Sequence, residues 1–342
     1  MIAWGKTFTR DELMKRAGDI SQICGVRQSV LSDGPGRGMR VFDVNTGGGL
    51  TFSVLPDRGM DIGWCRYNNL PVGYISKVGP VSPALAQYGG DAFLRSFMAG
   101  LLTTCGYTHM GAPCVDEGVA LGLHGRAHAL VSDGTVADCH WEGNEYTMTL
   151  RGTMREVSAL GENLQLTREI RAIAGENRFT ITDTLENCGF HSQPLMMLYH
   201  FNFGFPLVGP DTKFISSRCN GVVPRDDQAA TGLEQCRSFC DPIHGYMEQV
   251  FYHDLEPEAD DGLFAGLHNP TLPLSVKIHF KRSELPCLVE WKQMGEGDYV
   301  CGIEPSTWKP EGRAKAREQG ELLCIQPGEA RSFHLELTAE NC

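Results

Sequence analysis

The chain has 342 residues, including 40 glycines and 18 prolines, and a formal net charge of -12 at pH 7. This acidic balance excludes most nucleic-acid-binding proteins, because affinity for the phosphate backbone depends on clustered Lys and Arg side chains. No apolar run approaches the roughly 20 residues of a membrane-spanning helix, and the first ten residues lack the pattern of an export signal. We therefore expect a cytoplasmic protein without nucleic-acid or membrane partners, and the oligomeric state stays open.

The 13 cysteines are an odd number and are scattered along the chain without a CxxC pair. Zinc ribbons need paired cysteines at fixed spacing, and small disulfide frameworks need an even set in a short secreted chain. We expect these residues to be reduced thiols that pack as small hydrophobic side chains in a cytosolic protein.

The N-terminal segment carries a helix signal. Thr9 and Glu12 have the spacing of a capping box, and Gly18 stands where a short helix over 10–17 would end. This pattern predicts that residues 1–38 form a helical arm packed on a main domain over 39–342.

From residue 39 onward, short segments of alternating apolar and polar residues replace the helical pattern. MRVFDVNTGGGLTFSVL has the form of a β-hairpin, and strand-like segments follow densely from residue 130 to the final ARSFHLELTAE. The stretches 77–87 and 112–123 are expected to be loops, LHGRAHAL a turn followed by a strand, and 308–320 a short helix. We predict an all-β fold, a large twisted antiparallel β-sandwich of more than a dozen strands with a short N-terminal helix and minor helices.

Three residues are candidates for proton-transfer chemistry: His124 in LGLHGRAH, His200 in MMLYHFNFGFP and Glu304 in VCGIEPSTW. A carboxylate and an imidazole are a suitable acid and base pair near neutral pH. Each residue alone is a weak signal, because a lone histidine in an apolar strand is more often a hydrogen-bonded core residue. We expect the three to converge on one concave face of the sandwich.

These motifs carry a family resemblance. LHGRAH, YHFNFGFPL and GIEPST resemble, in this order, three segments of galactose mutarotases. Together with SQICGV, LPDRGMDIGW, FLRSFMAGLLTTCGYTHMG, EQVFYHDL and PEGRAKAREQGELLCIQPGE, they are similar to the DUF4432 branch of the aldose 1-epimerase superfamily over nearly the whole chain. The resemblance implies a galactose mutarotase-like sandwich that interconverts the anomers or ring forms of a free monosaccharide without a cofactor.

The resemblance also implies roles for single residues. Glu304 would be the general base at O1, His200 the general acid at the ring oxygen, and His124 would bind and polarise the sugar. Two arginines, Arg58 and Arg95, are equal candidates for holding sugar hydroxyls. The sugar itself stays open, because the substrate-binding aspartate of galactose mutarotases has no clear match here.

Further substrate contacts are expected from residues in the same motifs. Asp61 in PDRGMD and His109 in CGYTHMG are candidates for the mouth of the cleft, although a turn aspartate often only bonds its own backbone. Asn202 follows His200 in the same strand. Trp308 is the best candidate for stacking on a sugar face, against the alternative of core packing.

Two other functions remain open at this point. The first is a sugar-binding protein without turnover, and the second is a metal-dependent sugar isomerase or hydrolase on the same fold. A metal would require ligands such as His109, His124 and His128, whereas we expect no metal. Glycoside hydrolysis normally uses two carboxylates, for which Asp61 would have to join Glu304.

Overall fold

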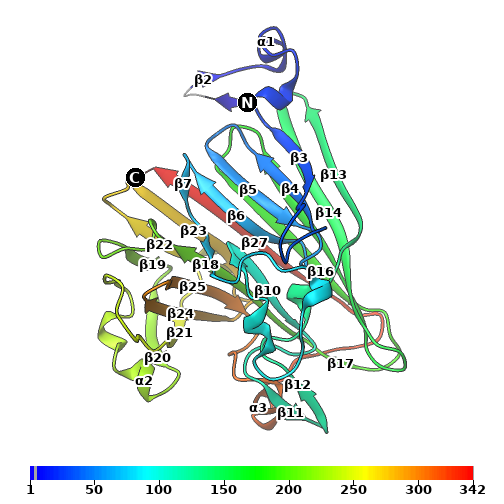
Figure 1. Cartoon of the computed structure of the whole chain (residues 1–342), viewed down its shortest axis with the longest axis vertical. Helices are drawn as coiled ribbons and strands as arrows, with labels where there is room; N and C mark the ends of the chain where they lie inside the picture. Colours follow the sequence, from blue (N-terminus) through cyan, green and yellow to red (C-terminus); the bar gives the residue numbers. More distant parts are fainter. Residues whose placement is uncertain (4–5, 342) are drawn as a thin grey trace.

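The computed structural model describes residues 1–3 and 6–341 and consists mainly of two large antiparallel sheets packed face to face (Figure 1). The first sheet has 11 strands and the second has eight. A continuous cluster of buried apolar side chains from both sheets fills the space between them. The predicted all-β sandwich is therefore confirmed. Within the described residues, no helix is long and apolar enough to cross a membrane.

The larger sheet carries the residues of interest. Its strands, in spatial order, are β20 (Cys219–Pro224), β21 (Gln249–Leu255), β24 (Cys287–Gly295), β25 (Asp298–Ser306), β18 (Met196–Gly204), β10 (Leu102–Tyr107), β6 (Asp61–Tyr67), β5 (Leu50–Leu55), β4 (Arg40–Asn45) and β3 (Gly25–Val30), with β7 (Leu70–Pro71) paired to β6.

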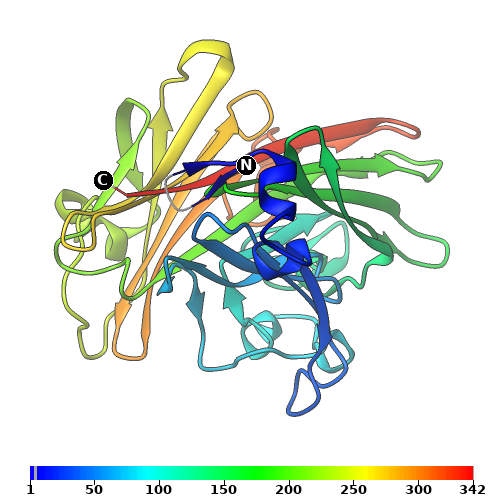
Figure 2. The same ribbon diagram turned by 90° about the horizontal axis from the view of Figure 1, so that it is seen from above.

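The eight-stranded sheet closes the other side of the core. Its order is β13 (Asp133–Glu142), β14 (Glu145–Val157), β15 (Asn163–Ile173), β16 (Arg178–Asn187), β27 (Ala330–Asn341), β23 (Leu274–Lys281), β22 (Gly262–Asn269) and β19 (Lys213–Ser216). Burial alternates along β15 and β16, because successive side chains of a strand point to opposite faces. Seen from above, the strands cross one another at different angles, as expected for a strongly twisted sheet (Figure 2).

Small elements surround the two sheets. Four two-stranded ribbons are formed by β1 (Ile2–Ala3) with β2 (Lys6–Thr7), β8 (Tyr74–Ile75) with β9 (Ala99–Gly100), β11 (Cys114–Asp116) with β12 (Val119–Leu121), and β17 (Gln193–Pro194) with β26 (Cys324–Ile325). The helices are α1 (Arg10–Met14), α2 (Asp227–Ala230) and α3 (Arg313–Glu318), and the 3₁₀ turns are η1 (Ile20–Gln22), η2 (Pro83–Leu85), η3 (Ala92–Arg95), η4 (Ala127–Ala129), η5 (Leu233–Gln235) and η6 (Ala259–Asp261).

The N-terminal segment contains the predicted capping box, which Thr9 and Glu12 form at the start of α1. Further along this segment, β3 pairs with β4 along its whole length and is an edge strand of the larger sheet. The division into an arm over 1–38 and a main domain over 39–342 stays a prediction. The strand predicted after LHGR is wrong. That segment makes the single turn η4, because Gly125 has the positive φ of 72° and turns the chain back toward the sheet.

Candidate active site

Glu304 and His200 lie side by side on adjacent strands. The antiparallel register of β18 with β25 places them opposite one another, and Glu304 Oε1 is 3.2 Å from His200 Nε2. Both residues are buried, at 2% and 5% exposure. The two proton-transfer candidates therefore form one coupled pair.

The pair occupies the face of the larger sheet that points away from the eight-stranded sheet. Along β18, Tyr199 and Phe201 point into the core between the sheets, so the alternating positions of Leu198, His200 and Asn202 point to the opposite face. This outer face is covered by loops, and a second apolar cluster packs there. The site is thus built between the sheet and its covering loops.

His124 reaches the same pair from one of these loops. Its ring centroid lies 5.8 Å from that of His200 in an edge-on arrangement. His124 has a φ of 59°. This backbone conformation costs energy for residues other than glycine, and such strained residues cluster at functional sites. Its backbone is held on both sides, because its N–H donates to Gly111 O and its carbonyl accepts from Gly106 N–H. The structure therefore brings together the three residues expected to converge.

Aromatic rings form the walls around the histidines. Phe97 and Trp291 lie 5.6 and 5.4 Å from His200, measured between ring centroids, and Phe93 lies 5.0 Å from His124. Sugars present apolar C–H faces that stack on such rings. Trp291 and Phe97 were not among the sequence candidates.

Gly302 leaves space beside the pair. A Cβ atom at this position would lie 2.7 Å from Glu304 Oε1 and 3.1 Å from His200 Cε1. The register also pairs Gly302 with Trp291. The absence of a side chain here lets the indole, the imidazole and the carboxyl group approach one another.

Burial sets the protonation states of the pair. It raises the pKa of Glu304 to about 8, with a further upward contribution from the Glu248 carboxylate. It lowers the pKa of His200 well below the usual value, and His124 adds to this effect. At neutral pH the carboxyl group therefore holds the proton and the imidazole is neutral, which reverses the resting states that the family resemblance implied.

The site keeps polar atoms without protein partners. His124 Nδ1, His200 Nδ1 and Asn202 Oδ1 are buried and accept or donate no hydrogen bond. Buried polar atoms are normally paired, so such a group points to a ligand or bound water. Asn202 donates its amide N–H to the backbone oxygen of His200, which fixes its orientation within the strand.

A charged pair stands next to the site on its more exposed side. Arg225 donates to Glu248 Oε1 at 3.0 Å, and Trp291 Nε1 donates to Glu248 Oε2 at 2.8 Å. The charges of Arg225 and Glu248 both act on the pKa of Glu304, in opposite directions. Neither Arg225 nor Glu248 was among the candidates selected from the sequence.

A cavity of about 890 Å³ lies beside the site. Phe93, His109 and His128 contribute to its lining, whereas His200 and Glu304 do not. Burial lowers the pKa of His109 to about 4 and that of His128 to about 3, so both are neutral. The structure therefore places His109 at this neighbouring cavity rather than beside the pair. Among the described residues, no group of three or more His, Cys, Asp or Glu side chains is arranged to hold a metal ion.

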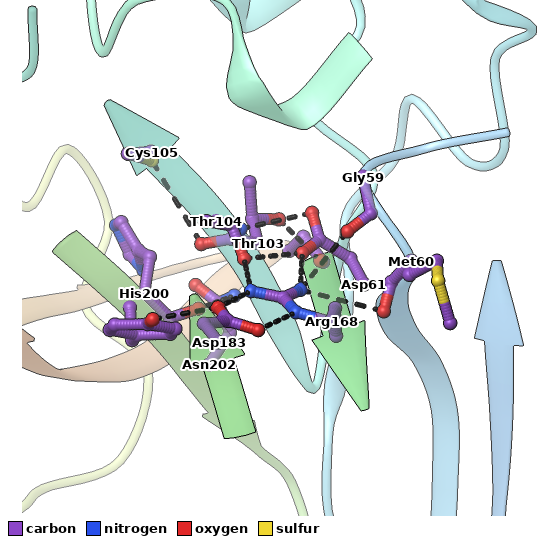
Figure 3. A network of polar contacts seen from close by, with 12 residues as sticks. Gly59, Met60, Asp61, Thr103, Thr104, Cys105, Arg168, Asp183, His200 and Asn202 are labelled. Atoms are coloured by element: carbon purple, nitrogen blue, oxygen red, sulfur yellow. Dashed lines mark hydrogen bonds and ion pairs between the residues drawn. The ribbon is translucent and has the colours of Figure 1, made fainter. Parts of the chain in front are cut away.

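Asp61 is located in the interior and not at the mouth of the site. Figure 3 shows it in a buried polar network, where it accepts hydrogen bonds from the N–H and hydroxyl groups of Thr104 and from Arg168 Nη1. Arg168 is fully buried and also binds Asp183 through two N–H groups. These bonds engage both oxygens of Asp61 inside the fold, where they link β6 to β10 and to Arg168 on β15. Its role in substrate binding stays a prediction.

The two arginine candidates also lie apart from the pair. Arg58 is 3% exposed and donates to the carbonyl oxygens of Val81 and Ser96, so it ties down the loop between them. Arg95 is exposed on the outer side of the same loop. No contact of either with Glu304 or His200 supports a role in holding sugar hydroxyls.

Trp308 packs in the outer apolar cluster together with Phe93 and Phe97 and is 8% exposed. The structure therefore places Trp308 among core residues, while the ring of Trp291 lies beside His200. The sequence offered one signal for Trp291. It lies in the strand immediately before that of Glu304, in a hairpin that brings the two side chains to the same face.

Comparisons with known proteins identify the family and the fold of the chain. The model of the DUF4432 family, described as a domain of unknown function, matches residues 36–339. No curated protein matches the sequence. The crystal structure of a proposed aldose 1-epimerase from Klebsiella pneumoniae subsp. pneumoniae is similar with a TM-score of 0.87 and 26% identity, covering 92% of this chain and 83% of that one.

Two more distant structures share the fold. A galactose mutarotase-like protein from Clostridium acetobutylicum has a TM-score of 0.64 at 15% identity, covering 94% of this chain and 100% of that one. Galactose 1-epimerase from Lactobacillus acidophilus NCFM has a TM-score of 0.57 at 13% identity, covering 93% and 99%. The chain therefore belongs to the DUF4432 family and has the galactose mutarotase-like fold.

Proposed function

We propose that this protein binds a free monosaccharide and opens and closes its ring at C1, as an aldose 1-epimerase does. The observation that carries the proposal is the buried pair of Glu304 and His200, 3.2 Å apart, with His124 beside it. Similarity to a proposed aldose 1-epimerase over most of both chains supports the same reaction class.

The reaction requires one acid and one base. Opening the ring removes the proton from the C1 hydroxyl and delivers a proton to the ring oxygen, which leaves the free aldehyde. Rotation about the C1–C2 bond and closure by the reverse transfers give the other anomer. Glu304 and His200 share a single proton, so each turnover returns the pair to its starting state.

The resting pair corresponds to the open-chain stage of this cycle. With Glu304 as base and His200 as acid in ring opening, the transfers leave a protonated carboxyl group and a neutral imidazole. Burial favours this same distribution in the free protein. Opening of a cyclic sugar with these roles therefore requires the proton to pass from Glu304 to His200, across the 3.2 Å between them, when the sugar binds. The transfers of ring opening then return the pair to its resting distribution.

The surroundings suit a neutral sugar. Trp291 and Phe97 offer aromatic faces to the C–H groups, while His124 and Asn202 have polar atoms free to bind hydroxyls. Asp61, the second carboxylate that hydrolysis would need, is engaged by Arg168 and Thr104. Ring opening thus fits the site better than hydrolysis. The cysteines of the described residues are free thiols, while Cys342 lies outside them, and we place the reaction in the cytoplasm on this basis.

Two-dimensional exchange NMR on a panel of free aldoses tests the proposal. We expect exchange cross-peaks between the anomeric protons of at least one sugar to grow with protein concentration above the rate in buffer alone. Saturation transfer in the same samples reports binding. Binding without faster exchange on any sugar would instead support a sugar-binding protein without turnover.

A further inference from the structure

A second group of reactive side chains lies on three neighbouring strands, away from the sugar site. Cys219 Sγ on β20 is 4.0 Å from His253 Nδ1 on β21, at the long end of a hydrogen bond to sulfur, and His253 Nε2 is 2.8 Å from Glu290 Oε2 on β24. Glu290 precedes Trp291, so it points to the opposite face of the sheet from the pair of Glu304 and His200. The three strands form one edge of the larger sheet (Figure 1).

The histidine is fixed in position and in tautomer. Its side chain is fully buried, and its ring stacks on Phe214 with centroids 4.8 Å apart. Because Glu290 accepts a hydrogen bond only from an N–H, the Nε2 atom carries the proton and Nδ1 is free to accept one from the thiol. The second oxygen of Glu290 is buried without a partner, which leaves its charge to act on His253.

Cys219 is a half-buried residue next to exposed ones. Cys219 begins an edge strand at an irregularity of the β20–β21 pairing, and Asn220 and Gly221 next to it are exposed. The hydrogen bond with His253 lowers the pKa of Cys219, and smaller contributions come from the backbone of Gly221, whose carbonyl oxygen lies 3.2 Å from Cys219 Sγ, and from Arg237. By contrast, burial raises the pKa of Cys236.

Other ionisable side chains surround this group. Arg237 lies over the ring of Phe214, at 5.5 Å from its centroid, and so adds positive charge on the side facing β19. Lys292 on β24 is bound to the backbone oxygens of Gln235 and Ser238. Reactive cysteines are found in such electropositive and partly exposed surroundings, with the thiolate as the attacking species.

We propose that Cys219, activated by His253 and Glu290, is a site of covalent modification by low-molecular-weight disulfides. The thiol proton moves to His253 Nδ1, and the sulfur attacks one sulfur of the disulfide R–S–S–R. A bond forms between Cys219 and that sulfur while the original S–S bond breaks, and its electron pair leaves on RS⁻, which takes up the proton. Cys219 is oxidised to a mixed disulfide and one R–S group is reduced to R–SH.

The test uses 2-hydroxyethyl disulfide, a neutral probe that surface charges do not steer. The folded wild-type protein is incubated with the probe from pH 5 to pH 9, quenched with acid, and analysed by peptide mass spectrometry. We expect Cys219 to react at least about 10-fold faster than the exposed Cys324 at pH 7, because its thiolate fraction is larger. Equal or slower reaction of Cys219 would overturn the proposal without the need for any variant.

A variant then tests whether the reactivity of Cys219 depends on Glu290 and His253 or only on its exposure to solvent. Glu290→Gln keeps the size of the side chain but removes the charge, so we expect the Cys219 rate at pH 7 to fall about 10-fold and its pH profile to move upward. Glu256→Gln is the matched control, because it removes an exposed carboxylate that pairs with Arg218 beside the thiol. The rate of the exposed Cys324 corrects for differences in probe reactivity, while protection of the buried Cys65 shows that each variant is folded. An unchanged Cys219 rate in folded Glu290→Gln, or an equal loss in Glu256→Gln, would contradict the proposed activation.

Discussion

The chemistry of the site depends on how two residues share one proton. Burial raises the pKa of Glu304 to about 8 and lowers that of His200 well below its usual value. An isolated carboxyl group and an isolated imidazole at their ordinary values would place the proton on the histidine instead. Because the two groups lie 3.2 Å apart, the proton can pass directly from one to the other.

This sharing predicts the pH dependence of activity. The active form carries one proton on the pair, so kcat/KM should be bell-shaped. The proton is lost as the pH rises through the raised value of Glu304, which places the alkaline limb near pH 8. The acid limb requires protonation of His200 and should lie well below pH 6.5. Polarimetry or exchange NMR across pH 4 to 10 measures the profile. An alkaline limb near 6.5 would mean that His200 holds the proton at rest.

At the scale of elements, the loop over 81–96 shapes the site. It carries Phe93, and it ends beside Phe97, so two of the aromatic walls depend on its position. Arg58 fastens it through the carbonyl oxygens of Val81 and Ser96. Arg58 therefore holds this loop in place, and the direct contact with the sugar that the sequence suggested stays a prediction.

Arg58→Ala should loosen this loop. Losing two hydrogen bonds from a buried charged group costs about 1.5–3 kcal/mol each at most, so we expect a lower free energy of unfolding together with faster proteolysis in 81–96. Because the walls move, kcat should fall as well as sugar affinity. Arg95→Ala, on the exposed side of the same loop, is the control and should change neither. A higher KM with unchanged kcat and unchanged proteolysis would support direct sugar contact by Arg58 instead.

The residues in distinctive motifs could be identified from the sequence, whereas the side chains that surround them in the fold could not. His124, His200 and Glu304 are identifiable because each lies in a short and distinctive segment. Trp291 was missed because its place beside His200 depends on the pairing of β24 with β25 and on the missing side chain of Gly302. The hydrogen-bond partners of Asp61 were not foreseen, because a turn motif alone does not reveal a partner such as Arg168, 107 residues further along the chain.

At the scale of the whole molecule, Arg168 links the two sheets. It extends from β15 of the smaller sheet, where Asp183 on β16 is its neighbour, to Asp61 and Thr104 of the larger sheet (Figure 3). Tyr199, adjacent to His200, donates its hydroxyl to Asp183 at 2.7 Å. This network thus holds the strands that carry the site from the side of the larger sheet that faces the smaller sheet.

Removing the guanidinium group of Arg168 should lower the free energy of unfolding of the whole fold. Arg168→Met leaves two buried carboxylates without their partner, and breaking a buried pair in this way typically costs about 3–5 kcal/mol. Arg151→Met is the matched control, because the exposed pair of Arg151 with Glu169 should contribute no more than about 1 kcal/mol. Urea unfolding followed by tryptophan fluorescence compares the two. Similar losses in both variants would show that the network does not hold the sheets together.

The most direct test of the central claim is anomer exchange by Glu304→Gln on a sugar that the wild-type protein interconverts. The substitution preserves size and hydrogen bonding but removes the group that gives and takes the proton. We predict that exchange measured by NMR falls by about 10² or more, while saturation transfer still detects sugar binding. If the variant exchanged anomers at the wild-type rate, Glu304 would not take part in proton transfer and the proposed mechanism would be wrong.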